Sequence, residues 1–380
     1  MIYLDNAATT FPKPPSVVKA VNTAMNFYGA NPGRSGHKMA EETAKQVYKC
    51  REKVGKFFNC EPEKVVFTMN CTHAINIAIQ GLAHKGEHIL ISDLEHNSVA
   101  RCVHQLYLDG ICSYSVVKTY SDPQETLISF YKAIRPNTKV ICCTHASNVF
   151  GQILPIEDIA KIAHQQGIYF IADAAQSGGV LNIDLKNSEI DFVCLPGHKG
   201  LYGPSGTGLL LCNSDAKLHP LTQGGTGTDS LLLEMPEYLP ERLESGTINT
   251  AGIIGLSAGI SYVEQHSTKK IYEFEMKLCK KIYEELRDVP WITFYGNEPE
   301  LNKNVPILSI TLGSMNGSES SDWLNKNGNI ATRGGFHCAK LAHGKMGTEK
   351  IGTCRISPAS FNNRADVEAL CRLIKRKKIS

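Results

Sequence analysis

Short apolar runs separated by stretches with helical spacing dominate residues 64–212. The runs that predict strands are KVVF (64–67), HILIS (88–92), CSYSVV (112–117), VICCTHA (140–146), YFIAD (169–173), DFVCLPG (191–197) and TGLLLC (207–212). The stretches between them that predict helices are 72–83, 96–108, 125–134 and 156–166. Apolar strands that alternate with helices predict a mostly parallel sheet covered by helices on both faces, which is the α/β class.

Helical patterns also flank this series of strands. The clearest repeats every three or four residues through Met39, Thr43, Val47, Cys50, Val54 and Phe57, as one face of a helix does. Further helices are predicted at 16–27, 251–264 and 269–287. The remaining segments, VPILSITL, WLNKNGN and a C-terminal helix, indicate a smaller α+β unit. We therefore predict a large domain over 16–260 and a small domain made of 1–15 and 261–380.

Composition narrows the class of protein. A chain of 380 residues with 42% hydrophobic and 20% charged residues is typical of globular proteins with more than one core. The net charge of +3 gives no argument for nucleic acid or a membrane surface as partner. The thirteen cysteines form no C-x-x-C and most lie in apolar runs, which favours reduced thiols in the cytoplasm and no metal site. No apolar run is long enough to span a bilayer.

Two ionisable side chains close predicted buried strands. Asp173 ends YFIAD, and Lys199 follows the strand DFVCLPG after one histidine. A carboxylate or an amine is costly to bury unless it has a partner or a function. Small residues surround both positions and leave room for a flat molecule. An aspartate for a pyridine nitrogen and a lysine for a Schiff base are what pyridoxal phosphate requires of a protein.

Further polar residues follow the carboxyl ends of the predicted strands, where ligands of parallel sheets bind. They are Asn70, Thr72, Glu95, His96, Asn148, Asp173, Gln176, His198 and Lys199. Asn70-Cys71-Thr72 stands between a strand and a helix, so it is either a phosphate site or a plain helix cap. His96 is either a ring that stacks on an aromatic cofactor or a structural histidine.

Cys338 lies in the short loop RGGFHCA. No apolar periodicity surrounds it and two glycines precede it, so it differs from the cysteines in apolar strands. A thiolate is the reactive form of cysteine, and His337 and Arg333 are cations that could lower its pKa. We predict that Cys338 is a nucleophile.

Several segments occur in an order known from one family. They are YLDNAATT, TMNCTHAIN, DLEHNSV, SNVFG, ADAAQS, GHKGLYGPSGTG, ESGTINTAGI and RGGFHCA. In this order and over nearly the whole chain, the sequence resembles class V aminotransferase-like enzymes, and among them the group II, selenocysteine lyase-like cysteine desulfurases. The resemblance implies the pyridoxal-phosphate-dependent transferase fold type I, with a seven-stranded sheet in a cofactor-binding domain at 16–260 and the nucleophilic cysteine loop in the small domain.

The same resemblance assigns roles at the cofactor. Lys199 would hold pyridoxal 5'-phosphate covalently, and Asp173 would pair with its ring nitrogen. His96 would stack on the ring and also take part in catalysis. Gln176 would donate to the phenolic oxygen, and Asn148 would lie near that oxygen and the substrate carboxylate.

Phosphate contacts would come from Thr72 with the adjoining Cys71, and from His198. Thr247, in the E-x-G-T-x-N segment, would reach the phosphate in the neighbouring subunit, which implies a homodimer. At two positions this chain departs from the group II pattern. Pro196 stands where those enzymes have serine, and an extra Gly200 follows the lysine.

The implied reaction is the conversion of L-cysteine to L-alanine, with the sulfur transferred to Cys338 as a persulfide. Arg355, in CRISPAS, would bind the substrate carboxylate with two hydrogen bonds, and Arg333 would help to shape the same entrance. A sulfur-acceptor protein, in iron–sulfur cluster assembly or another branch of sulfur metabolism, could take the sulfur. Alternatives are a selenocysteine lyase acting on L-selenocysteine, a kynureninase-like enzyme or epimerase of class V, and a scaffold protein without cofactor.

Overall fold

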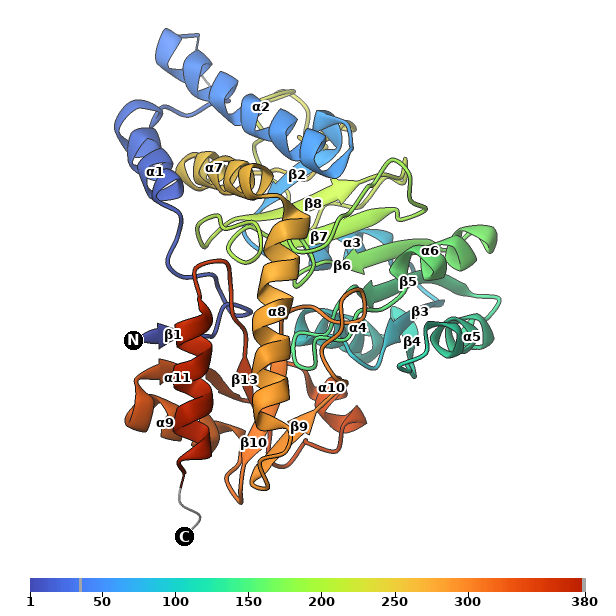
Figure 1. Ribbon diagram of the computed structural model, residues 1–380. Helices are drawn as coiled ribbons and strands as arrows, with labels where there is room; N and C mark the ends of the chain where they lie inside the picture. Colours follow the sequence, from blue (N-terminus) through green and yellow to red (C-terminus); the bar gives the residue numbers. More distant parts are fainter. Residues whose placement is uncertain (34–35, 378–380) are drawn as a thin grey trace.

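A seven-stranded sheet lies at the centre of the computed structural model, which describes residues 1–33 and 36–377 (Figure 1). Its strands are, in spatial order, β2 (Val65–Thr68), β8 (Gly208–Cys212), β7 (Phe192–Pro196), β6 (Tyr169–Asp173), β5 (Thr138–Thr144), β3 (Glu87–Ser92) and β4 (Cys112–Val117). Only β8 runs against its two neighbours, and the other adjacent pairs are parallel. The predicted mostly parallel seven-stranded sheet is confirmed.

Helices cover both faces of this sheet. One face packs on α3 (Cys71–Leu82) and α4 (Asn97–Leu108), and the other packs on α2 (Lys38–Phe58), α5 (Pro123–Ala133), α6 (Ile156–Gln165) and α7 (Thr250–His266). In β6, Phe170 and Ala172 belong to the second core and Ile171 to the first. Because both faces are buried, the strands are continuously apolar instead of alternating.

The buried face of α2 differs by one residue from our prediction at each end. Met39 is 65% exposed, and Ala40 takes the buried position one turn before Thr43. At the other end Phe58 is buried while Phe57 lies only partly against the core. The helix begins at Lys38, so Met39 lies in its first turn on the outer side. Helix α1 (Pro15–Phe27) packs on α7.

A second, smaller sheet lies beside the first and is antiparallel. Its order is β12 (Arg333–Gly335), β13 (Thr353–Ile356), β10 (Leu308–Leu312) and β9 (Ile292–Tyr295). Helices α8 (Thr268–Leu286), α9 (Gly317–Gly328) and α11 (Arg364–Lys375) share its core. The N-terminal strand β1 (Ile2–Tyr3) joins this part by pairing with β11 (Ile330–Ala331), so β1 lies beside α9 and α11 in Figure 1. The predicted domain boundaries stay a prediction.

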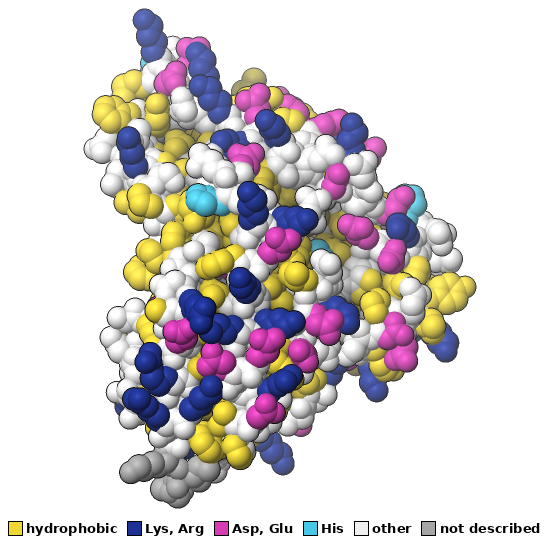
Figure 2. Space-filling model, viewed as in Figure 1, with side chains coloured by type: hydrophobic (Ala, Val, Ile, Leu, Met, Phe, Trp, Pro, Cys, Tyr) yellow, Lys and Arg dark blue, Asp and Glu magenta, His cyan; other side chains and the backbone are white. Residues whose placement is uncertain are grey.

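Charges of both signs are mixed on the surface formed by α8 and α11 (Figure 2). Ion pairs there join the two helices, for example Lys281 with Glu368 and Lys375 with Glu285.

None of the helices within residues 1–33 and 36–377 combines the length and hydropathy that crossing a membrane requires. Across the same residues, no group of histidines, cysteines and carboxylates has the arrangement of a metal site.

A buried ion pair fastens α2 to the large sheet. Arg51 donates to Glu244 from both Nη nitrogens at 2.8 Å, and its side chain is 7% exposed. Arg51 also donates to the Val65 carbonyl, and Glu244 accepts from the Phe67 backbone at 2.5 Å. The pair therefore joins α2, β2 and the segment before α7.

We expect Arg51→Met to lower the free energy of unfolding by about 3 kcal/mol, because Glu244 would remain buried without its cation. Urea denaturation followed by circular dichroism measures this change. The matched control is Lys45→Met, which removes an exposed pair with Glu41 and should cost less than about 0.5 kcal/mol. Equal small costs for both variants would contradict the structural role of the buried pair.

Candidate active site

The carboxyl ends of β2, β3, β5, β6 and β7 meet at one edge of the large sheet, and a cavity of about 210 Å³ lies there. Eight of the twelve predicted site residues line this cavity: Cys71, Thr72, His96, Asn148, Asp173, Gln176, His198 and Lys199. They come from five separate segments that follow five strands. Parallel strands bring these segments together because their carboxyl ends share an edge.

The cavity holds one acidic side chain, Asp173, and one basic side chain, Lys199, and burial shifts the pKa of both. Burial raises the pKa of Asp173, while its hydrogen bond from Ala175 and the Lys199 charge lower it. Burial and the charge of Arg355 lower the pKa of Lys199 to about 8. The lysine therefore gains or loses its proton near pH 8.

One carboxylate oxygen of Asp173 is occupied by the protein. Oδ1 accepts from the backbone of Ala175 at 2.9 Å and from the Cys71 thiol at 3.5 Å. Burial raises the pKa of Cys71 well above its ordinary value, so this thiol stays protonated and donates. Among the described residues Oδ2 has no hydrogen-bond partner. It remains available to a ligand in the cavity.

The two histidines of the cavity are uncharged. Burial and the nearby Lys199 lower the pKa of both His96 and His198 to about 4. His96 caps α4, because its Nδ1 accepts from the Ser98 backbone at 3.0 Å. The cap fixes the ring at the cavity wall. The structure shows that His96 is the cap of α4 and lines the cavity, and its stacking on a cofactor stays a prediction.

Buried polar atoms that have no partner among the residues the structure describes show that this region suits a polar ligand. They are Asn148 Oδ1, His198 Nδ1 and Arg355 Nε. Such atoms are rare in folded proteins, so a cluster of them indicates a missing partner. Pyridoxal phosphate fits the set: Asp173 Oδ2 suits its ring nitrogen, while His198 and the N-terminal turn of α3 at Thr72 suit its phosphate. Asn70, not Thr72, caps α3, so the Thr72 hydroxyl is left for a ligand.

Of the two departures at the lysine loop, Gly200 has a structural reason and Pro196 has none. Pro196 ends β7 and lines the cavity without offering a hydroxyl. Gly200 packs so tightly that a Cβ there would lie 2.4 Å from the Gly178 carbonyl oxygen.

Lys13, which we did not predict, donates to the His198 carbonyl at 2.7 Å. Burial lowers the pKa of Lys13 to about 8.

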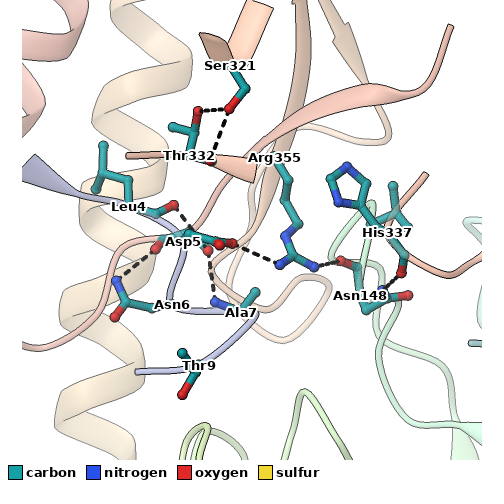
Figure 3. A network of polar contacts seen from close by, with 12 residues as sticks. Leu4, Asp5, Asn6, Ala7, Thr9, Asn148, Ser321, Thr332, His337 and Arg355 are labelled. Atoms are coloured by element: carbon teal, nitrogen blue, oxygen red, sulfur yellow. Dashed lines mark hydrogen bonds and ion pairs between the residues drawn. The ribbon is translucent and has the colours of Figure 1, made fainter. Parts of the chain in front are cut away.

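Arg355 lies beside the cavity and is 1% exposed. Its Nη2 contacts Asp5 Oδ1 at 3.1 Å, and its Nη1 donates to the Asn148 carbonyl at 2.7 Å (Figure 3). Arg333 stands directly opposite Arg355 in the pairing of β12 with β13. Sequence reasoning missed Asp5. The available signal was a carboxylate within YLDNAATT, directly after the opening strand.

The Cys338 loop lies next to the same network. Cys338 is the only exposed cysteine of the thirteen. The loop is held by Asn148, whose Nδ2 donates to the His337 carbonyl at 2.8 Å (Figure 3). The cavity, the buried arginine and the exposed thiol therefore form one connected site.

Our expectation that His337 is a cation beside Cys338 is wrong. The His337 ring is 4% exposed, and its Nε2 contacts the Thr353 carbonyl at 2.9 Å. Burial and the charge of Arg355 lower the pKa of His337 to about 3, so the ring is neutral at physiological pH. Of the two predicted cations, Arg333 alone carries a charge there.

Arg355, Arg333 and Cys338 lie outside the cavity lining but in the adjoining network, whereas Thr247 belongs to neither. It lines two other cavities, of about 440 Å³ and 320 Å³, beside Ile248. The contact of Thr247 with a partner subunit's phosphate stays a prediction.

The cavity at the sheet edge thus combines a lysine, an aspartate, a capping histidine and the N-terminus of α3, a set that suits pyridoxal phosphate. The chain belongs to the class-V aminotransferase family, whose model matches residues 2–370. A relative described as a "Probable cysteine desulfurase", from Methanothermobacter thermautotrophicus, is 32% identical over 97% of this chain and 92% of its own.

Two solved structures agree with this assignment. The apo cysteine desulfurase from Thermococcus onnurineus NA1 has a TM-score of 0.90 and 29% identity, covering 98% of this chain and 94% of its own. An Escherichia coli cysteine desulfurase in an S-sulfonic acid form has a TM-score of 0.86 and 25% identity, with the same coverage. The fold is that of fold type I enzymes, as the sequence predicted.

The lowered pKa of Lys199 predicts its reactivity in the cofactor-free protein. Below about pH 8 the amine is protonated and unreactive, and above it the amine is neutral and nucleophilic. Reductive methylation with formaldehyde, quantified by mass spectrometry of the Lys199 peptide, should therefore reach half its maximal rate near pH 8. The exposed Lys350 serves as the comparison in the same digest. A half-maximum near the ordinary value of 10.5 would contradict the effect of burial.

Proposed function

We propose that the protein is a cysteine desulfurase that converts L-cysteine to L-alanine and takes the sulfur onto Cys338 as a persulfide. The observation that carries the proposal is the joining of the single exposed thiol to a Lys199–Asp173 cavity through Asn148 and Arg355. The name shared by the relatives supports the same activity.

Pyridoxal phosphate, when bound to Lys199, would supply the electron sink that makes the substrate Cα proton acidic. Asp173 Oδ2 would hold the ring nitrogen, and the neutral His96 ring would lie against the ring face. Gln176 and Asn148 would lie near its phenolic oxygen. Cys71 keeps Asp173 Oδ1 engaged and so directs Oδ2 into the cavity. Thr72 and His198 would hold the phosphate.

Arg355 is the group that would bind the substrate carboxylate. Its Nε has no partner among the described residues, and each Nη has a hydrogen beyond those given to Asp5 and Asn148. A carboxylate can therefore make two parallel hydrogen bonds to the guanidinium. Arg333, opposite in the sheet, adds positive charge at the entrance.

Lys199 would move the Cα proton. With a pKa of about 8 in the free site, its amine is basic enough to accept a proton and can be neutral near physiological pH. The cavity is buried, so the proton is held at Nζ rather than lost to bulk water.

The Cys338 thiolate would then attack the substrate sulfur. An S–S bond forms and the Cβ–S bond breaks, with its electron pair staying on Cβ, which is protonated to give alanine. L-cysteine and one thiol thus yield L-alanine and one persulfide, and no external oxidant is needed. An external thiol or a sulfur-acceptor protein would remove the persulfide sulfur.

The proposal also covers the oligomeric state of the enzyme and its cellular compartment. A homodimer would bring Thr247 of one subunit to the phosphate in the other, which agrees with its position outside its own chain's cavity. Thirteen free thiols, most of them buried, suit the reducing cytoplasm. Assignment to group II remains a prediction from the sequence motifs.

Alanine production from L-cysteine with excess dithiothreitol tests the activity. Cys338→Ala should lose at least about 100-fold in kcat because Cys338 is the only exposed thiol, and the Cys71 thiol in the cavity stays protonated. The control is Cys60→Ala, which removes a half-buried thiol whose pKa burial raises to about 11 and should leave kcat unchanged. Wild-type rates of alanine release from Cys338→Ala would rule out its role as nucleophile.

A further inference from the structure

The nucleophile loop has a strained backbone. His337 and Cys338 have φ of 48° and 55°, in the left-handed region that residues other than glycine rarely adopt. Each such residue costs about 1–3 kcal/mol and persists only where its surroundings hold it. Two in succession at the proposed nucleophile therefore require strong restraints on both sides.

One side is held by the large sheet's carboxyl edge. The Cys338 carbonyl accepts from the backbone of Asn97 at 2.7 Å, and Asn97 directly follows His96. The His337 carbonyl accepts from Asn148. These contacts fix the two strained peptides but not the chain that follows them.

The other side is held by an ion pair that neither the sequence analysis nor the proposed chemistry uses. Helix α10 (Lys340–Lys345) begins two residues after Cys338, and its last residue, Lys345, reaches back to the large sheet. Lys345 Nζ contacts Asp93 Oδ1 at 3.2 Å and the Thr119 carbonyl at 2.5 Å. The pair is largely buried, with side chains 16% and 14% exposed.

Asp93 and Thr119, which we call the Lys345 socket, are hydrogen-bonded to each other and both contact the Lys345 amine. The Thr119 hydroxyl donates to Asp93 Oδ1 at 2.6 Å, and the Thr119 backbone contacts the same oxygen at 3.2 Å. The two residues follow β3 and β4, neighbouring strands of the large sheet. Ala339 and Ala342 bury the inner face of this segment in the large core. Helix α10 is therefore attached to the large sheet although it follows β12 of the small one.

We propose that Lys345 is a positioning residue, whose ion pair with Asp93 anchors α10 and so keeps Cys338 in the strained conformation that presents its thiol to the substrate. The inference rests on the proposed function, since it concerns the same thiol. Sulfur transfer requires the attacking and accepting sulfur atoms in close alignment, and a displacement of about 1 Å can cost 100-fold in rate. Releasing the anchor lets the His337–Cys338 pair relax toward the right-handed region and draws the thiol away.

The test is Lys345→Met, which keeps the length of the side chain and removes its charge. We expect kcat for alanine formation to fall about tenfold or more, while KM for L-cysteine changes less than about twofold, because Arg355 is untouched. Hydrogen exchange of the 336–346 peptide should become faster in the cofactor-loaded enzyme. Lys345→Arg should recover most of kcat by restoring the cation. Lys350→Met, at an exposed lysine in the next turn of chain, is the matched control and should behave as wild type.

Asp93→Asn provides an independent variant that keeps the shape of the socket, and it decides the outcome if Lys345→Met does not fold. It should reproduce the loss of kcat, and the double variant should add little to either single change because both remove one interaction. Unchanged kcat and unchanged exchange in the folded variants would overturn the proposal. A wild-type enzyme that makes no alanine would instead refute the proposed function, so the two failures are distinguishable.

Discussion

The site depends on one buried guanidinium. Arg355 joins the N-terminal segment through Asp5, the large sheet through the Asn148 carbonyl and the small sheet through its own strand β13. A charge buried this deeply is stable only when it is paired and hydrogen-bonded, so its partners must be in place. Asn148 in turn donates to the His337 carbonyl and so restrains the Cys338 loop. The position of the thiol is thus tied to the group that would bind the substrate.

Burial also decides which groups in the site carry charge. It lowers the pKa of His96 and His198 to about 4 and of His337 to about 3, so three histidines near the cavity are neutral. Burial raises the pKa of Glu95, beside His96, to about 8. The remaining positive charge belongs to Lys199 and the arginines. A substrate carboxylate and a cofactor phosphate would add negative charge to that of Asp173 and Asp5.

Much of this was readable from the sequence because it depends on periodicity and on strand ends. The sheet, its helices and the cavity residues all follow from apolar runs that close with polar residues, as Asp173 and Lys199 do. The misses concern contacts between distant segments. The roles of Asp5 and Lys345 depend on hydrogen bonds to residues 350 and 252 positions away in the sequence, which no local pattern encodes. The neutrality of His337 likewise results from burial and from the charge of Arg355, which the neighbouring sequence does not show.

The most direct test of the whole account is a single turnover of the cofactor-loaded enzyme with L-cysteine in the absence of any external thiol, followed by mass spectrometry of its peptides. The account predicts one equivalent of alanine and the mass of one added sulfur atom on the peptide that carries Cys338, with none on the peptide of Cys60. Alanine formed without sulfur on Cys338, or sulfur found on another cysteine in its place, would contradict it.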